Sequence, residues 1–150
     1  MSSSKIIELR FYGEPAPQGS KQVTRWGAIR EVSKKIQPWR ASIQYACQVQ
    51  YKGPVITGPV SLEVVFVMPR SKGHWSKSIK KNGQLLPSAP VEHTKTPDVD
   101  KLLRGVLDPL TIRCGGCVLE DDSIVVSVQA SKRYQRAHEE VGAFVTIKVL

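Results

Sequence analysis

All five aspartates of this 150-residue chain fall within residues 96–126. They are Asp98, Asp100, Asp108, Asp121 and Asp122. The chain carries a formal net charge of +9, so general surface solubility does not explain why every aspartate is confined to one short stretch. Converging carboxylates supply the oxygen ligands and negative charge that Mg²⁺ requires. A metal held in this way can activate water and stabilise the leaving oxygen of a phosphodiester. The stretch therefore predicts metal-assisted phosphodiester chemistry.

A helix is predicted to begin near Asp100. Its apolar positions follow helical spacing and would face a core: Leu102, Leu103, Val106, Leu107 and Leu110. Asp100, Arg104 and Asp108 are spaced i, i+4, i+8, so they form one polar ridge beside the apolar face. Pro109 lacks an N–H and restricts the residue before it, so we expect the helix to end or kink near Leu107.

A second acidic group, residues 120–122, precedes a β-branched run that is typical of a strand beginning after a turn. Acids at a helix start and at a strand start can meet in space. The alternative is structural, since Asp98 could cap the helix and the aspartates of the second group could be turn residues. Their joint restriction to one segment of a basic chain favours a site, whereas Asp108, followed by proline, is interpreted as structural.

One family resemblance follows from the order of these motifs. The chain reads PDVDKLLRGVLDPL and then, after a short insertion, LEDDSIVV. This resembles the RusA family of Holliday junction resolvases, whose pattern runs D-x-D-N-L-x-K, then D-A-L, and later D-D before a strand. The resemblance implies that Asp98, Asp100 and Asp122 are catalytic residues that bind Mg²⁺, which Mn²⁺ could replace. Arg104 falls where the family usually has a catalytic lysine, and Lys101 falls where it usually has asparagine. Because arginine does not readily donate a proton, we interpret the role of Arg104 as electrostatic.

The resemblance also implies an activity and partners. We expect a Mg²⁺-dependent endonuclease that resolves Holliday junctions by paired nicks in branched DNA during recombination and repair, in a phage or prophage setting. A two-fold homodimer with one active site per subunit and no small-molecule cofactor is expected. The alternatives are a non-catalytic or catalytically silenced protein that binds branched DNA, and a nuclease acting on flaps or forks.

Composition agrees with a nucleic-acid partner. Twenty-two Lys and Arg stand against thirteen Asp and Glu, and the sequence pI is near 9.7. This excess indicates a polyanion, with nucleic acid favoured over membrane. The sequence has no apolar run long enough to span a bilayer, and its first residues lack the apolar core of a signal peptide, so a cytoplasmic location is expected.

Three cysteines fit a reducing compartment better than a disulfide framework. Cys114 and Cys117 enclose two glycines, a spacing that invites a zinc interpretation. No second ligand pair lies at a convincing spacing, and Cys47 falls on a predicted helix. We therefore interpret the pair as incidental thiols in a loop rather than as a structural zinc site.

The segment 69–95 is a long loop with six Lys and Arg, one acid and three prolines. Loops of this length inside a domain are usually functional or disordered. We predict a DNA-binding arm in which cations contact phosphates while His74 and Trp75 stack at an opened junction. Over the whole chain, the candidate phosphate contacts are Lys21, Arg25, Arg30, Arg70, Lys72, Lys77, Lys80, Lys81, Lys101 and Lys132, with Arg133 as an alternative to Lys132.

The remaining patterns predict one α+β domain over residues 1–150, in the order β-α-β-α-β-β, with helices packed on a mixed sheet. Alternation of apolar residues predicts strands over residues 5–12, 60–68, 123–134 and 141–149, the last two antiparallel. A helix is predicted over residues 35–51 and a short hairpin over residues 22–32, about Trp26 and Gly27. The family resemblance extends over nearly the whole chain and implies a RusA-like fold.

Overall fold

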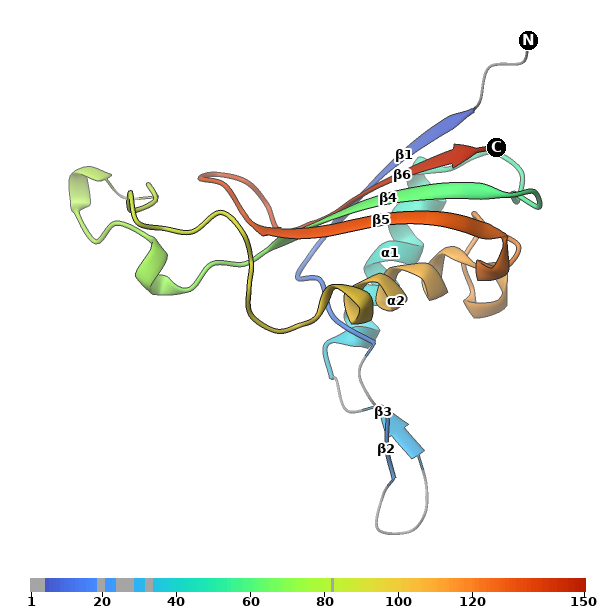
Figure 1. Cartoon of the computed structure of the whole chain (residues 1–150), viewed down its shortest axis with the longest axis horizontal. Coiled ribbons are helices and arrows are strands. Elements are labelled where there is room, and N and C mark those ends of the chain that lie inside the picture. The colour runs from blue at the N-terminus through green and yellow to red at the C-terminus, as the bar shows by residue number, and fades with distance from the viewer. Residues whose placement is uncertain (1–4, 19–20, 24–28, 32–33, 82) are drawn as a thin grey trace.

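The computed structural model describes residues 5–18, 21–23, 29–31, 34–81 and 83–150. Its main sheet has four strands in the order β1-β6-β4-β5 (Figure 1). They are β1 (Ile6–Tyr12), β4 (Val60–Met68), β5 (Val125–Tyr134) and β6 (Gly142–Val149). β4 and β5 are parallel, whereas β6 is antiparallel to both β1 and β4. The predicted α+β class with a mixed sheet is therefore confirmed.

One face of the sheet forms the core. Every second residue of β1 is buried, as the alternating pattern requires. In register with these lie buried residues of β6 and β4, so the apolar face is continuous across three strands: Ile7, Leu9, Phe11, Ala143, Val145, Ile147, Leu62, Val64 and Phe66. The helices α1 (Ile36–Gln50) and α2 (Val99–Leu110) cover this face (Figure 1). Neither helix covers the other face of the sheet (Figure 1).

Helix α1 buries a stripe at helical spacing against the sheet: Ile36, Trp39, Ile43 and Cys47. At its C-terminal end, the Gln50 amide reaches the backbone of Arg10 in β1. The Arg10 N–H donates to Gln50 Oε1 at 2.8 Å, and Gln50 Nε2 donates to the Arg10 carbonyl at 2.7 Å. These two bonds tie α1 to the outer edge of β1.

Helix α2 is longer than predicted. It continues past Leu107 to Leu110 with Pro109 inside it. The predicted end near Leu107 was wrong because Pro109 and Leu110 are both buried, and this burial stabilises a last turn that backbone preferences alone disfavour; a kink near Leu107 stays a prediction. The turn is closed by Thr111, whose N–H and hydroxyl donate to the Asp108 carbonyl at 3.1 and 2.8 Å.

The last two strands differ in detail from the prediction. β5 begins at Val125 rather than at Ser123, because a short 3-10 turn, η4 (Asp122–Ile124), precedes it. β5 and β6 run antiparallel as predicted, but they do not pair with each other, since β4 lies between them. β5 is therefore an outer strand of the main sheet.

A hairpin and an arm project from this body (Figure 1). β2 (Lys21–Val23) and β3 (Ile29–Glu31) pair antiparallel and confirm the predicted hairpin, whose tip at Trp26 and Gly27 lies outside the described residues. The described part of segment 69–95 is folded rather than disordered. It contains two 3-10 turns, η1 (Lys72–His74) and η2 (Ile79–Lys81), and an antiparallel bridge between Trp75 and Leu85. No helix within the described residues is long and apolar enough to cross a membrane.

Candidate active site

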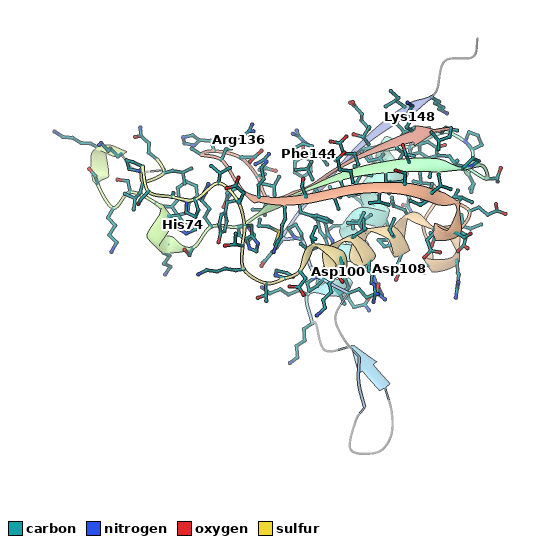
Figure 2. The ribbon with its side chains drawn as sticks, viewed as in Figure 1. His74, Asp100, Asp108, Arg136, Phe144 and Lys148 are labelled. Carbon is teal, nitrogen blue, oxygen red and sulfur yellow. The ribbon has the colours of Figure 1, made fainter. Side chains whose placement is uncertain are left out.

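The N-terminal end of α2 presents two exposed carboxylates. Asp98 occupies the N-cap position with extended backbone, and its side chain is 62% exposed. Although aspartate commonly caps helices, the Asp98 carboxylate accepts no capping hydrogen bond from the described helix. Asp100 lies in the first turn and is also exposed (Figure 2). The carboxylates at this end are therefore available to bind a ligand.

Two cations accompany these acids. Lys101 Nζ lies 3.9 Å from Asp98 Oδ2. Arg104 follows Asp100 by one turn and is exposed, and no ion pair within the described parts of the chain involves its guanidinium. Residues four apart on a helix are neighbours. Arg104 and Lys101 can therefore contact an anion that approaches the Asp98 end of α2.

The far end of the polar ridge has a different role. Asp108 Oδ2 lies 3.3 Å from Arg40 Nη2 of α1, and the two side chains are 29% and 25% exposed. This partly buried pair joins the two helices. It agrees with the interpretation of Asp108 as structural.

The acids before β5 are also divided in role. Asp121 Oδ2 accepts a hydrogen bond from the Ser123 hydroxyl at 2.8 Å, and this bond lowers the pKa of Asp121. Asp121 thus stabilises the turn, as aspartates in turns often do. Asp122 is exposed at the first position of η4.

The structure does not bring Asp122 to Asp98 and Asp100 within one chain. The segment before Asp98 lies beside Lys132, late in β5, whereas Asp122 precedes the first residue of that strand. At about 1.5 Å per residue, α2 separates its two ends by roughly 18 Å. Across the described residues of a single chain, no group of three or more His, Cys, Asp or Glu side chains could hold a metal.

Lys132 and Arg133 both contact protein groups. Lys132 Nζ donates to the carbonyls of Lys95 and Pro97 at 2.5 and 2.8 Å. Arg133 makes a two-pronged pair with Glu139, at 2.7 and 2.9 Å, and this pair lowers the pKa of Glu139 to about 2. The structure therefore gives both residues a role within the fold, where the sequence predicted a phosphate contact.

Comparison with known proteins identifies the family. Residues 12–148 match the family described as endodeoxyribonuclease RusA. The chain belongs to the RusA family. It is also 29% identical over 134 residues to a Bacillus subtilis (strain 168) protein named uncharacterized protein YqaN, and the match covers 85% of this chain and 87% of that protein. The resemblance inferred from the aspartate pattern is confirmed, and RusA membership supports nuclease activity on DNA.

RusA-family nucleases generally depend on divalent metal ions. The residues at the Asp98 end of α2 have the chemistry to bind such an ion. Asp98 and Asp100 supply hard carboxylate oxygens, and both are exposed. The carboxylate of Asp98 is not used for capping, so coordination would break no capping bond. Mg²⁺ usually takes its further oxygens from water, substrate or protein, so two carboxylates can form part of its donor set.

The arm of this RusA chain exposes four of its predicted phosphate contacts: Lys72, Lys77, Lys80 and Lys81. Trp75 is half-buried. The side chains of Lys21 and Arg30 and the whole of Arg25 lie outside the described residues. The segment that carries these lysines, residues 72–81, projects away from the sheet (green in Figure 1), so it can reach a long polyanion.

Arg70 and Tyr134 form the base of the arm. Arg70 Nε donates to the Gln135 carbonyl and Nη1 to the Pro90 carbonyl, both at 2.6 Å. The Arg70 guanidinium also lies 5.0 Å from the centroid of the buried Tyr134 ring. The rings of His74 and His93 meet the same ring edge-on at 4.9 and 4.8 Å. Sequence reasoning missed this cluster, because residues far apart in the chain form it and no local pattern marks them.

Proposed function

We propose that this protein is a Mg²⁺-dependent endonuclease that resolves Holliday junctions by paired nicks in branched DNA. The observation that carries the proposal is the N-terminal end of α2, where Asp98 occupies the cap position without capping and Asp100 is exposed beside it. Membership of the RusA family supports a DNA nuclease. The specificity for four-way junctions rests on that membership and on the basic arm.

In the proposed reaction, Asp98 and Asp100 would hold the metal, which would supply activation of water and stabilisation of the leaving oxygen. A bond forms between water oxygen and phosphorus, and the bond from phosphorus to one sugar oxygen breaks; the attacking water gives up a proton to solvent, and the leaving sugar oxygen takes one up from solvent. Arg104 and Lys101 contact the phosphate and offset the negative charge that grows on it. Arg104 acts through its charge, since arginine stays protonated at neutral pH.

The third predicted ligand, Asp122, is proposed to come from a second copy of the chain. In one chain Leu119, which comes shortly before Asp122, bridges Thr111 at the C-terminal end of α2, whereas Asp98 precedes the N-terminal end of this helix, which is about 18 Å long. In a two-fold homodimer, one end of α2 can approach the other end of the same helix in the second copy. Asp122 of the partner subunit would then complete the carboxylate set and give two equivalent sites for two symmetric strands.

The arm supplies the proposed DNA contact beyond the site. Its exposed lysines, Lys72, Lys77, Lys80 and Lys81, would bind phosphates. Arg70 is assigned a bracing role instead, because two backbone carbonyls and the Tyr134 ring already occupy its guanidinium. Bracing the arm sets the direction in which those lysines point.

The experiment that tests the proposal is cleavage of a labelled four-way junction beside a linear duplex of matching sequence. Native protein, Asp100→Asn and Asp108→Asn are compared with Mg²⁺, with Mn²⁺ and with chelator. Loss of a metal ligand removes several kcal/mol of transition-state stabilisation, so Asp100→Asn should cleave on the order of 100-fold more slowly or worse. It should still bind the junction, because removing a negative charge reduces repulsion of the phosphate.

Asp108→Asn is the matched control, with the same change on the same helix. It should keep cleavage and lose about 1 kcal/mol of stability with the partly buried Arg40 pair. Equal cleavage by native protein and Asp100→Asn would remove Asp100 from the site. Faster cutting of flaps or forks than of junctions would replace the proposed substrate.

A second candidate function is junction binding without cleavage. It is favoured by the Lys101 ammonium, which stands 3.9 Å from Asp98 where the family usually has asparagine. A cation there competes with a metal for the same carboxylate. Tight junction binding by native protein with no nicks at any Mg²⁺ or Mn²⁺ concentration would establish this function, and Lys101→Asn would then be expected to restore cleavage.

A further inference from the structure

We propose that Lys132 is a positioning residue for Asp98, acting through the backbone of residues 95–97, and that it does not contact DNA. The inference rests on the proposed function, since it assigns Asp98 to the metal. It departs from the sequence-based prediction of a phosphate contact at Lys132.

The chain that leads to Asp98 is fastened along the outer edge of β5. The Tyr134 N–H donates to the Val91 carbonyl at 2.9 Å, and Glu92 and Arg133 form an antiparallel bridge. The His93 ring is buried and packs against Tyr134 at 4.8 Å. After residue 94, the contacts that hold this segment come from the Lys132 side chain.

Lys132 binds two of the last three backbone carbonyls before Asp98, those of Lys95 and Pro97. It lies opposite Phe66 of β4 on the sheet face that carries the helices, and it is half-buried. An ammonium has three donors, and two of them go to the carbonyls of Lys95 and Pro97. Hydrogen bonds from a charged donor are about twice as strong as neutral ones. The Pro97 carbonyl belongs to the peptide unit that joins directly to Asp98, so the ammonium fixes the backbone one bond from it.

Nothing else in the described structure supplies this restraint at Pro97. Proline has no N–H to donate, and the Asp98 carboxylate makes no capping bond that would orient it. The direction of the carboxylate therefore depends on the backbone before it and on the Lys101 ammonium, 3.9 Å from Asp98 Oδ2. A metal ligand displaced by about 1 Å loses much of its effect, so loss of the Lys132 bonds should weaken metal binding.

The same contacts disfavour a phosphate role. Only one Lys132 donor remains, and the side chain is half-buried beside His93, whose pKa is lowered by burial and then by the Lys132 charge. By contrast, the side chains of Lys77, Lys80 and Lys81 are exposed. These three lysines are therefore better placed than Lys132 to contact DNA phosphates.

The test compares Lys132→Met with Lys148→Met. Lys148 is exposed on the open face of the sheet, opposite α2 (Figure 2), so its variant controls for loss of one charge. The first readout is amide hydrogen exchange in protein without metal or DNA. Exchange across residues 94–102 should be about tenfold faster in Lys132→Met than in native protein and unchanged in Lys148→Met.

The second readout is the Mg²⁺ dependence of junction cleavage. Lys132→Met should need about tenfold more Mg²⁺ for half-maximal cleavage, as expected when a group that orients a ligand is lost. Its junction affinity in chelator should stay within about twofold of native. Lys132→Arg keeps the charge and the donors, so it should recover part of both effects, and it replaces Lys132→Met if that variant does not fold.

The opposite pattern overturns the inference. Junction affinity that falls, with a log–log salt slope smaller by about one, and exchange that stays native would make Lys132 a phosphate contact. If native protein makes no nicks at all, the proposed function fails, and the exchange comparison still decides whether Lys132 holds the backbone before Asp98.

Discussion

The two ends of α2 carry similar acids that do different work. At the C-terminal end, Asp108 pairs with Arg40 of the neighbouring helix, and the nearby Asp121 accepts a bond from a serine hydroxyl. At the N-terminal end, the carboxylate of Asp98 is exposed and makes no capping hydrogen bond to the helix. Lys132 holds the backbone that precedes it. Asp108 and Asp121 use their carboxylates to hold the fold, whereas the carboxylates of Asp98 and Asp100 stay exposed.

This difference teaches that an acid's role depends on its neighbours more than on its place in a cluster. All five aspartates fall within one stretch of sequence, yet a 12-residue helix stands between the two groups. Within the described residues of one chain, no cluster of three or more such side chains brings the two groups together.

The first prediction mixes two inactive variants. Asp100→Asn and Asp122→Asn should each lose cleavage alone. If each site takes Asp100 from one copy and Asp122 from the other, a mixed dimer holds one intact site and one doubly altered site. A 1:1 mixture with random pairing should regain about one quarter of the native nicking rate, as single nicks. The measurement is junction nicking before and after the variants are refolded together.

A mixture that stays inactive would place all three acids in one chain's site and would contradict the contrast between the two ends. Mixing Asp100→Asn with Asp98→Asn is the control. Because both changes fall at the same end of α2, every site in that mixture carries one altered acid, and no activity should return.

The second prediction concerns the arm, residues 69–95, which leads from β4 to the N-terminal end of α2. Lys80→Ala combined with Lys81→Ala should weaken junction binding and reduce the log–log salt slope by about two, since two phosphate contacts are lost. Lys5→Ala combined with Lys148→Ala removes the same charge away from the arm and should change the slope little. If the two double variants have equal log–log salt slopes, the arm does not contact the DNA.

The third prediction concerns the middle of α2, where Gly105 lets an earlier segment cross closely. A Cβ at residue 105 would lie 2.6 Å from the Ala16 carbonyl oxygen. Because a backbone atom cannot move aside cheaply, Gly105→Ala should lower the free energy of unfolding by about 1–2 kcal/mol, despite its better helix propensity. Gly58→Ala is the control, since nothing lies within 4 Å of that Cβ. Urea unfolding of both variants measures the difference.

The fourth prediction is a pH dependence at the turn between β5 and β6. The pair with Arg133 lowers the pKa of Glu139 from 4.5 to about 2. Because the folded value is the lower one, the pair stabilises the protein fully above pH 4.5, and this stability is lost as pH falls through about 2. The melting temperature of Glu139→Gln should therefore lie below native at pH 7, and the gap should narrow below pH 4.5. Glu140→Gln, at an exposed neighbour, should show no such narrowing.

Local pattern was sufficient for most of the fold. Period-two alternation located β4 at its observed bounds, and helical spacing located α1 within one residue at each end. The end of α2 was misplaced because burial of Leu110 outweighs the restriction that Pro109 imposes. The pairing of β6 with β4 instead of β5 was also out of reach, since neighbours in a sheet are chosen by long-range packing.

The candidate site was only partly accessible from sequence. The spacing of Asp98 and Asp100 placed them together at a helix start, and the family match agrees with the motif that contains them. The distance from Asp98 to Asp122 could not be inferred, because it depends on where the chain returns to the sheet after α2. The bonds of Arg70 and Lys132 to carbonyls could not be inferred either, since carbonyls have no signature in a sequence.

The amide of Gln50 has a consequence for assembly. An outer strand offers backbone N–H and carbonyl groups to which another strand can add. On β1 the two groups of Arg10 are already satisfied by one side chain, which sits where an incoming strand would have to lie. A second copy cannot lengthen the sheet past β1 without displacing that amide. Gln50→Ala would expose the edge, and a tendency to form fibres or higher oligomers through β1 would be the result.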